Sequence, residues 1–599
     1  MNIQHMSHQA RGWLFLFITL VSLTVGQLLG GAMLLNMVKQ PLTLLGLDTL
    51  IRTWWAYRHA TPMPESIRLG LEMAAVFTAA PIMLIGVYFF SFHNKEELHG
   101  SARFANDHDL KTSGLFPTKE ERGEHPSLLL GKMDKGRYKN QFVELEGQTF
   151  VAVSAPTGSG KGVGFVLPNL VNFRDSVVVV DVKLENLIKT AGFRQAQGQE
   201  VYLFSPDGYV TSEEDRLNGK LRSHRWNPLH YIRRAEAYRV GDILTITTSL
   251  YPLKGKDDIW PENAGKLFTG LTLWMLDTEE QTGIAPSIPY MLNLVGVQGG
   301  LKNWMKQQVQ RPDISQVCKN EFNAFVAYPD ETAGSVLANF NGPLKIFADA
   351  TVAKATSGND FDFNDLRKKG MSVYVGIQPG NLEKFGKLLN LFFEQLITIN
   401  TRVLPENDPT LTHQCLLMLD EFPALGKINQ IAKSIGYTRQ YNLRYAIIYQ
   451  DQSQNEENYG KEVAKNIIKN CSAEVVYPPR EVDAHVKALS ETLGTKTVKV
   501  RNHSENRGDK KTKGNSWSYQ KRPLMMPHEI CELGHKMHPK APIGTDVLLI
   551  KENQRPFIMK KIIYFDEPAL QSRVEFSKKN VPKVPYLKDV TIAAVKDSA

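Results

Sequence analysis

Two long stretches near the N-terminus, residues 13–38 and 73–90, contain no charged residue. A helix rises about 1.5 Å per residue, so about 20 apolar residues cross the roughly 30 Å of hydrocarbon in a bilayer. We therefore expect two transmembrane helices, the second of which contains Pro81, a residue that membrane helices tolerate. A cleaved signal peptide is the alternative for the first stretch, but its apolar length exceeds the usual range and a second stretch follows.

From residue 150 onward, short apolar runs alternate with amphipathic segments. Strands are expected at residues 150–153, 177–182, 201–204, 371–377, 415–419 and 445–449. Helices are expected at residues 163–172, 184–197 and 382–403. Runs that are apolar at every position are typical of strands buried on both faces of a parallel sheet. The pattern predicts an α/β fold with a parallel sheet covered by helices.

Between about residues 226 and 350 the strand pattern fades. Apolar residues recur there at helical spacing, as at Leu267, Leu271 and Trp274. We therefore expect an inserted helical domain between the first and second groups of strands.

A glycine-rich turn follows the strand expected at 150–153. It consists of Ala155, Pro156, Thr157, Gly158, Ser159, Gly160, Lys161 and Gly162. Glycines let consecutive backbone N–H groups face one point, where a helix N-terminus and one ammonium, here Lys161, stabilise a polyphosphate. Ala155 replaces the usual first glycine and Gly162 the usual Mg²⁺-binding hydroxyl, so a turn that binds no phosphate is the alternative.

The strand expected at 415–419 ends in Asp420 and Glu421. In phosphate-loop enzymes one such carboxylate holds Mg²⁺ or its water, and another residue orients or deprotonates the attacking water. We expect Asp420 to bind the metal and Glu421 to activate water beside the glycine-rich turn. Each motif alone is weak, but together they predict a P-loop ATPase with ATP and Mg²⁺ as cofactors.

Five segments, in this order, resemble those of the type IV secretion system coupling proteins, the TraG-like conjugal transfer ATPases. They are residues 155–162 (APTGSGKG), 178–185 (VVVDVKLE), 226–229 (WNPL), 419–427 (LDEFPALGK) and 522–524 (RPL). The resemblance spans nearly the whole chain, and the glycine after the lysine looks like a habit of this family. It implies a RecA-like nucleotide domain with an inserted all-α domain that receives cargo.

The resemblance also implies a function. Such a protein is an ATPase of the bacterial inner membrane that recruits relaxase-bound single-stranded DNA, protein effectors or both. It couples ATP hydrolysis to their delivery into the channel of a type IV secretion system. The family works as a homohexamer, in which Arg439 matches the position proposed to reach a neighbouring subunit's γ-phosphate; Arg444 is the nearby alternative. Gln450 is expected to contact the γ-phosphate or the attacking water.

Five regions follow from these motifs. They are a membrane anchor with a short periplasmic loop (1–95), a first part of the nucleotide domain (96–225), the all-α insert (226–350), a second part of the nucleotide domain (351–570) and a basic tail (571–599). Because ATP is cytoplasmic, we expect the N-terminus and the residues after about 95 to be cytoplasmic.

Composition adds limits rather than a function. A net charge of +9 in 599 residues fits contact with nucleic acid or an anionic membrane surface, without requiring either. The four cysteines lie far apart without a C-x-x-C pair, which argues against a zinc knuckle or a disulfide framework. The basic segment 496–522 contains Trp517 and Tyr519 and is interpreted either as a contact to phosphates and bases or as a solvated hairpin.

Two other functions share some of these features. A double-stranded DNA translocase of the chromosome-partitioning type also combines membrane spans, a phosphate loop and a RecA-like core. It would carry a long linker and a winged-helix reader, and no Pro/Gln-rich linker of that kind is found in the sequence. A docking platform, in which nucleotide only assembles the ring, is the second alternative.

Overall fold

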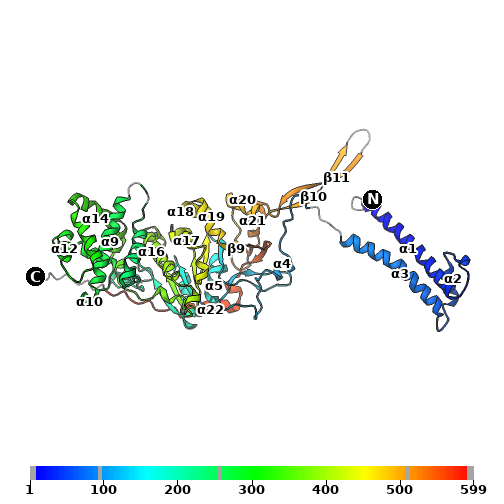
Figure 1. The fold of residues 1–599 in the computed structure, drawn as a ribbon, viewed down its shortest axis with the longest axis horizontal. Coiled ribbons are helices and arrows are strands. Elements are labelled where there is room, and N and C mark those ends of the chain that lie inside the picture. The colour runs from blue at the N-terminus through cyan, green and yellow to red at the C-terminus, as the bar shows by residue number, and fades with distance from the viewer. Residues whose placement is uncertain (1–7, 92–96, 254, 256–257, 507–511, 590–599) are drawn as a thin grey trace. The chain divides into compact units, whose positions relative to one another are not determined.

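The computed structural model describes residues 8–91, 97–253, 255, 258–506 and 512–589. Parts of two predicted segments, residues 507–511 of the basic segment and 590–599 of the tail, lie outside the described residues. The chain divides into two compact units, Met1–Leu98 and His99–Ala599. Figure 1 shows the elements of both units.

The first unit is a helical hairpin of α1 (His8–Met37) and α3 (Glu65–Ser91), with α2 (Thr49–Tyr57) in the connection. Within it, Phe15–Met37 and Glu65–Leu84 are long and apolar enough to cross a membrane, by length and composition. The second helix begins at Glu65, before the uncharged stretch at 73–90, because its first two turns carry Glu65, Arg68 and Glu72 between apolar residues and so did not count as uncharged.

Small residues bring α1 and α3 together. A Cβ on Gly26 would lie 2.8 Å from the carbonyl oxygen of Ala74, and one on Gly30 would lie 2.4 Å from that of Gly70. Backbones approach this closely only where side chains are minimal. The Gly26/Gly30 pair of α1 is therefore used for packing inside the unit.

The second unit is built on an 11-stranded sheet with the order β2-β1-β13-β12-β9-β3-β8-β7-β4-β6-β5. The strands are β1 (Leu128–Lys132), β2 (Phe142–Leu145), β3 (Phe150–Ser154), β4 (Ser176–Val180), β5 (Glu200–Phe204), β6 (Met371–Val375), β7 (Cys415–Leu419), β8 (Leu443–Tyr449), β9 (Cys471–Val476), β12 (Asp546–Lys551) and β13 (Phe557–Lys560). From β9 to β5 all pairs are parallel, whereas β12, β13, β1 and β2 extend the sheet in antiparallel fashion. The predicted α/β fold with a parallel sheet is confirmed, and the antiparallel edge was not predicted.

The parallel strands are buried on both faces because alternate residues enter two different cores. In β4, Val177 and Val179 pack with Leu187 of α6, whereas Val178 and Val180 pack in the core that contains Phe392 of α16. The alternation of side chains along a strand explains this division. Helices therefore cover both faces, as the uninterrupted apolar runs indicated.

These covering helices come from several parts of the chain. On the face of α6 (Glu185–Ala196) lie α5 (Leu167–Asn172) and α22 (Pro568–Lys579), which contact it. The opposite face carries α16 (Leu382–Asn400) and α17 (Asn429–Ser434). The remaining helices outside the insert are α4 (Asp107–Lys111), α7 (Glu213–Leu217), α18 (Gln452–Tyr459), α19 (Lys461–Lys469), α20 (Ala484–Thr492) and α21 (Pro527–Glu532).

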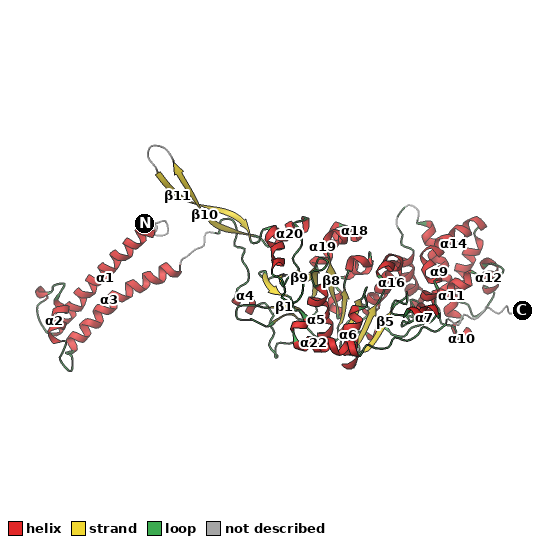
Figure 2. Ribbon diagram, turned by 180° about the vertical axis from the view of Figure 1, so that it is seen from behind, coloured by secondary structure: helices red, strands yellow, loops and turns green. Residues whose placement is uncertain are grey.

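Between α7 and β6 the described residues form helices. They are α8 (Glu236–Leu250), α9 (Ile259–Asp277), α10 (Glu279–Thr282), α11 (Ile288–Val295), α12 (Leu301–Gln308), α13 (Gln316–Ala327), α14 (Asp330–Leu344) and α15 (Ala350–Thr356). Figure 2 shows these helices gathered at one end of the second unit, away from α20. They share a continuous core with the sheet through residues such as Phe268 and Leu271, so an independent all-α domain at 226–350 stays a prediction.

Candidate functional site

The glycine-rich turn lies between β3 and α5. Gly158 and Gly160 have φ values of 75° and 86°, in the left-handed region that side chains other than glycine rarely adopt. After Lys161 the chain makes one π-helical turn, Gly162–Val166, before α5 begins. The hydroxyl oxygen of Ser159 is buried without a hydrogen-bond partner among the described residues, which marks a polar group shaped for a ligand.

Lys161 meets both predicted carboxylates. Its ammonium nitrogen lies 2.9 Å from Oδ1 of Asp420 and 2.5 Å from Oε1 of Glu421. The three residues meet because β3 and β7 are parallel strands, whose carboxyl ends lie at the same edge of the sheet. Glu421 has a φ of 68°, an uncommon conformation for a non-glycine residue that is concentrated at functional sites.

Burial shapes the electrostatics of these carboxyl groups. It raises the pKa of Asp420, an effect that the nearby Lys161 ammonium opposes. Burial also raises the pKa of Asp181, at the end of β4, to about 6, although this carboxyl accepts the N–H of Leu187 at 2.7 Å. Carboxyl groups held out of water in this way favour a nearby cation. Lys161 supplies one such cation.

Gln450 joins the turn to the carboxylates. It follows β8, whose Tyr449 carbonyl accepts the N–H of Ala155 at 2.9 Å. The side-chain oxygen of Gln450 accepts a hydrogen bond of 2.5 Å from the Thr157 hydroxyl, and its nitrogen donates to Oε2 of Glu421 at 2.6 Å. One amide therefore contacts both the glycine-rich turn and Glu421.

Two basic residues that the sequence did not point to also bind the turn. The ammonium of Lys561 donates to the carbonyl oxygen of Ser159 at 2.8 Å and lies 4.4 Å from the ring centre of Tyr477, and Arg480 donates to the carbonyl oxygen of Thr157 at 2.8 Å. Burial lowers the pKa of Lys561 to about 8. Because these cations bind the carbonyl groups of the turn, its N–H groups are left to bind an anion.

Arg439 lies elsewhere. It precedes β8, at the amino ends of the parallel strands, where its guanidinium donates to the carbonyl oxygen of Asn470 at 2.7 Å and lies 5.3 Å from the ring centre of Phe150. The length of β3, about 3.3 Å per residue, separates this edge from Lys161 of the same chain. A role at a neighbouring subunit's site stays a prediction.

The alternative residue, Arg444, is fully buried. Its guanidinium donates to the carbonyl oxygens of Thr149, Pro126 and Leu145. This geometry ties β8 to the strand connections around it.

Of the other residues near the strand ends, Lys183 is exposed and its charge opposes the raised pKa of Asp420. Glu185 forms an ion pair with Lys189 within α6 and is not part of the Lys161 cluster.

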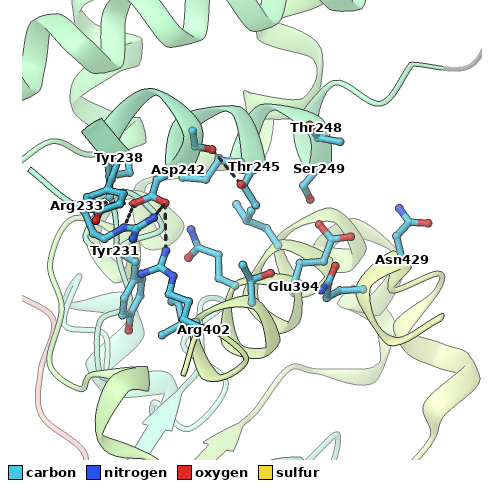
Figure 3. A pocket seen from close by; sticks show the side chains of 18 of the residues that line it. Tyr231, Arg233, Tyr238, Asp242, Thr245, Thr248, Ser249, Glu394, Arg402 and Asn429 are labelled. Atoms are coloured by element: carbon cyan, nitrogen blue, oxygen red, sulfur yellow. Dashed lines mark hydrogen bonds and ion pairs between the residues drawn. The ribbon is translucent and has the colours of Figure 1, made fainter. Parts of the chain in front are cut away.

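A separate cavity of about 570 Å³ lies between α8, α16 and α17 (Figure 3). At its rim Asp242 is paired with Arg233 at 2.8 Å and with Arg402 at 3.4 Å, and Glu394 lies near Asn429. None of the residues of the glycine-rich turn or of the Asp420/Glu421 pair lines it. The cavity is therefore distinct from the candidate site.

Comparison with known proteins identifies the family. A family model described as "Type IV secretory system Conjugative DNA transfer" matches residues 103–586. The chain belongs to this family. The resemblance inferred from the sequence motifs is thereby confirmed.

Members of this family match over most of their length. The chain is 28% identical over 566 residues to the conjugal transfer protein TraG of Escherichia coli, covering 87% of this chain and 85% of TraG. It is also 28% identical over 526 residues to VirD4 of Agrobacterium fabrum, covering 86% of this chain and 72% of VirD4.

Solved structures share the fold. The bacterial conjugative coupling protein TrwBΔN70 superposes with a TM-score of 0.51 at 16% identity, covering 78% of this chain and 95% of TrwBΔN70. TrwB in complex with the non-hydrolysable ATP analogue ADPNP also has a TM-score of 0.51, at 15% identity over 77% of this chain and 93% of that chain.

Proposed function

We propose that the protein is an inner-membrane ATPase that recruits relaxase-bound single-stranded DNA, protein effectors or both. It couples ATP hydrolysis to their delivery into a type IV secretion system. The observation that carries this proposal is the position of the Lys161 ammonium, which contacts both Asp420 and Glu421 beside the glycine-rich turn. Membership of the conjugative DNA transfer family supports the cargo and the secretion channel as partners.

The residues present fit a nucleotide with Mg²⁺. Lys161 and the N–H groups of the turn bind phosphates, and the unpartnered Ser159 hydroxyl adds a polar contact. Asp420 holds Mg²⁺, although Gly162 offers no hydroxyl as a second protein ligand. When bound, ATP with Mg²⁺ supplies the phosphoanhydride whose hydrolysis drives the cycle. TrwB, which shares the fold, was solved with ADPNP and with ADP and Mg²⁺, which supports these cofactors.

Competition for Lys161 gives the site its order of events. Its ammonium neutralises Glu421 in the structure, and the same ammonium is the group that binds a phosphate. When Lys161 turns to a phosphate, Glu421 keeps the hydrogen bond from Gln450 and becomes free to orient or deprotonate water. Gln450 also accepts a hydrogen bond from Thr157, so in this proposal it links Glu421 to the turn and senses the loss of the γ-phosphate.

A homohexamer completes the site in this proposal. Arg439 is not engaged with the Lys161 of its own chain, and its position at the opposite edge of the sheet suits contact with an adjacent copy. An arginine supplied in this way stabilises charge in phosphoryl transfer and contributes about 10³–10⁵ in rate.

Membrane anchoring is supported by the two candidate spans of the first unit. The proposal places the N-terminus and the second unit in the cytoplasm, where ATP is present. The loop between the spans then faces the periplasm.

Hydrolysis measurements on the full chain in nanodiscs test the proposal. We expect wild-type protein to hydrolyse ATP, with Lys161→Ala and Glu421→Gln inactive. Glu185→Gln is the matched control, because this carboxylate lies outside the Lys161 cluster and pairs with Lys189. Equal phosphate release by wild type and Glu421→Gln would instead favour the platform in which nucleotide only assembles the ring.

A further inference from the structure

The basic segment after α20 forms a separate two-stranded hairpin. Its strands are β10 (Thr495–Asn506) and β11 (Thr512–Pro523), and Figure 1 shows them projecting from the body of the second unit beyond α20 and α21. The antiparallel register pairs Lys499 with Tyr519 and Arg501 with Trp517. The hairpin is therefore held by its own ladder, not by the large sheet.

The register gives the hairpin two different faces. Directly opposed residues share a face, so Lys499, Arg501, Trp517, Tyr519 and Lys521 all lie on one side. The other side carries residues such as Val498, Val500, Asn502, Ser518 and Gln520. That side also carries Lys496 and Arg522 at the base of the hairpin, where Arg522 pairs with Glu529. Trp517 and Tyr519 lie with Lys499, Arg501 and Lys521 on the first side, which we call the cation–aromatic face.

The side chains of the cation–aromatic face are exposed and close together. Trp517 is 56% exposed and Tyr519 is 36% exposed. The Lys499 ammonium lies 4.9 Å from the ring centre of Trp517 and 5.7 Å from that of Tyr519, and Arg501 lies 5.8 Å from that of Trp517. Two exposed aromatic rings and two cations thus form one contiguous patch on this face.

The base of the hairpin is fixed to the start of the second unit. The N–H of His99 donates to the Thr497 hydroxyl at 2.9 Å, the N–H of Ala102 donates to the carbonyl of Thr495 at 3.0 Å, and Ser101 pairs with Lys496. Residues 92–98 connect this point to the end of α3.

We propose that the cation–aromatic face docks on an anionic lipid surface. The inference goes beyond the proposed function but rests on its membrane anchoring. Tryptophan and tyrosine favour the interface between headgroups and acyl chains, and lysine and arginine near the surface are attracted to anionic lipids. The short connection to a candidate membrane span is what favours lipid over nucleic acid, for which the same side chains are chemically suited. Docking would orient the second unit on the membrane.

Quenching of Trp517 by lipid tests the inference. The full chain is reconstituted in nanodiscs that contain brominated phosphatidylcholine, with or without phosphatidylglycerol, and the emission of Trp517 is taken as the difference between wild type and Trp517→Phe. We expect strong quenching in the anionic discs. Lys499→Gln/Lys521→Gln should weaken docking about fivefold for each lysine, since each contributes about that factor at an anionic surface.

Asn502→Asp/Gln520→Glu is the matched control. It changes the net charge by the same two units on the opposite face, and quenching should be retained. Absence of Trp517 quenching, or an equal effect of both double variants, overturns the inference. Weakened binding of a single-stranded oligonucleotide with unchanged lipid quenching in Lys499→Gln/Lys521→Gln also overturns it. Failure of the chain to remain in the discs would contradict membrane anchoring itself.

Discussion

Replacing Lys561 by methionine should lower nucleotide affinity while leaving the free energy of unfolding nearly unchanged. The Lys561 side chain is buried, and its ammonium donates to the carbonyl oxygen of Ser159 at 2.8 Å. Methionine keeps an unbranched side chain of similar length but removes the charge. The turn then loses one of the two cations that hold its carbonyl groups.

The expected magnitudes follow from the surroundings of Lys561. A pKa lowered from 10.5 to about 8 means that burial disfavours the charged form by about 3 kcal/mol. The lost hydrogen bond to Ser159 costs about 1.5–3 kcal/mol, because it involves a charged donor. These contributions nearly cancel, so the free energy of unfolding should change by less than about 2 kcal/mol. Nucleotide affinity has no such compensation, and we expect a loss of about tenfold.

The dependence on pH has a defined sign. Below pH 8 the folded Lys561 is charged, so the difference in nucleotide affinity between wild type and variant is full there and shrinks as the pH rises through 8. Between pH 8 and 10.5 the unfolded chain retains a proton that the folded chain has released. The free energy of unfolding of the wild type therefore rises with pH in that window relative to the variant.

The assay is titration of the nanodisc-bound full chain with a non-hydrolysable ATP analogue, accompanied by thermal unfolding of the same samples. Lys560→Met is the matched control, because this neighbouring lysine pairs with Asp546 rather than with the turn. Unchanged affinity of Lys561→Met at pH 7 would refute the reasoning, as would the same loss in Lys560→Met.

Three further predictions concern other residues. Arg439→Ala should abolish turnover while nucleotide affinity is retained; a wild-type rate of phosphate release would reject its role. Arg444→Leu should lower the free energy of unfolding by about 3–5 kcal/mol in denaturation, because three buried carbonyl groups lose their donor. Asp181→Asn should flatten the pH dependence of the free energy of unfolding. Burial raises the pKa of Asp181 to about 6, so the wild type loses stability as the pH rises from about 4 to 6. Parallel curves of stability against pH for the two proteins would contradict this.

The sequence predicted the strands whose residues are buried on both faces of the sheet. β4 and β7 were predictable because their strand residues are buried on both faces, and a parallel sheet then brings Lys161 to Asp420 and Glu421 at its carboxyl edge. Gln450 was predicted from its place at the end of the strand expected at 445–449, and the structure places its amide between Thr157 and Glu421.

The antiparallel edge gave no comparable signal. β13 alternates buried and partly buried residues over only Phe557–Lys560, and its partner β1 lies more than four hundred residues earlier, at the pair Lys132 and Lys560. The local sequence carries no sign of a pairing between two such distant segments. Lys561 directly follows β13, and Arg480 lies in the connection after β9 (Cys471–Val476); neither strand was predicted, so neither residue was found from the sequence.

Calorimetric titration of the nanodisc-bound full chain with Mg²⁺ and a non-hydrolysable ATP analogue tests the central claim most directly. The account predicts binding by the wild type and a loss of at least about tenfold in Lys161→Ala, whose ammonium would contact the phosphates. Undetectable binding by the wild type, or equal affinity in the two proteins, would contradict the account.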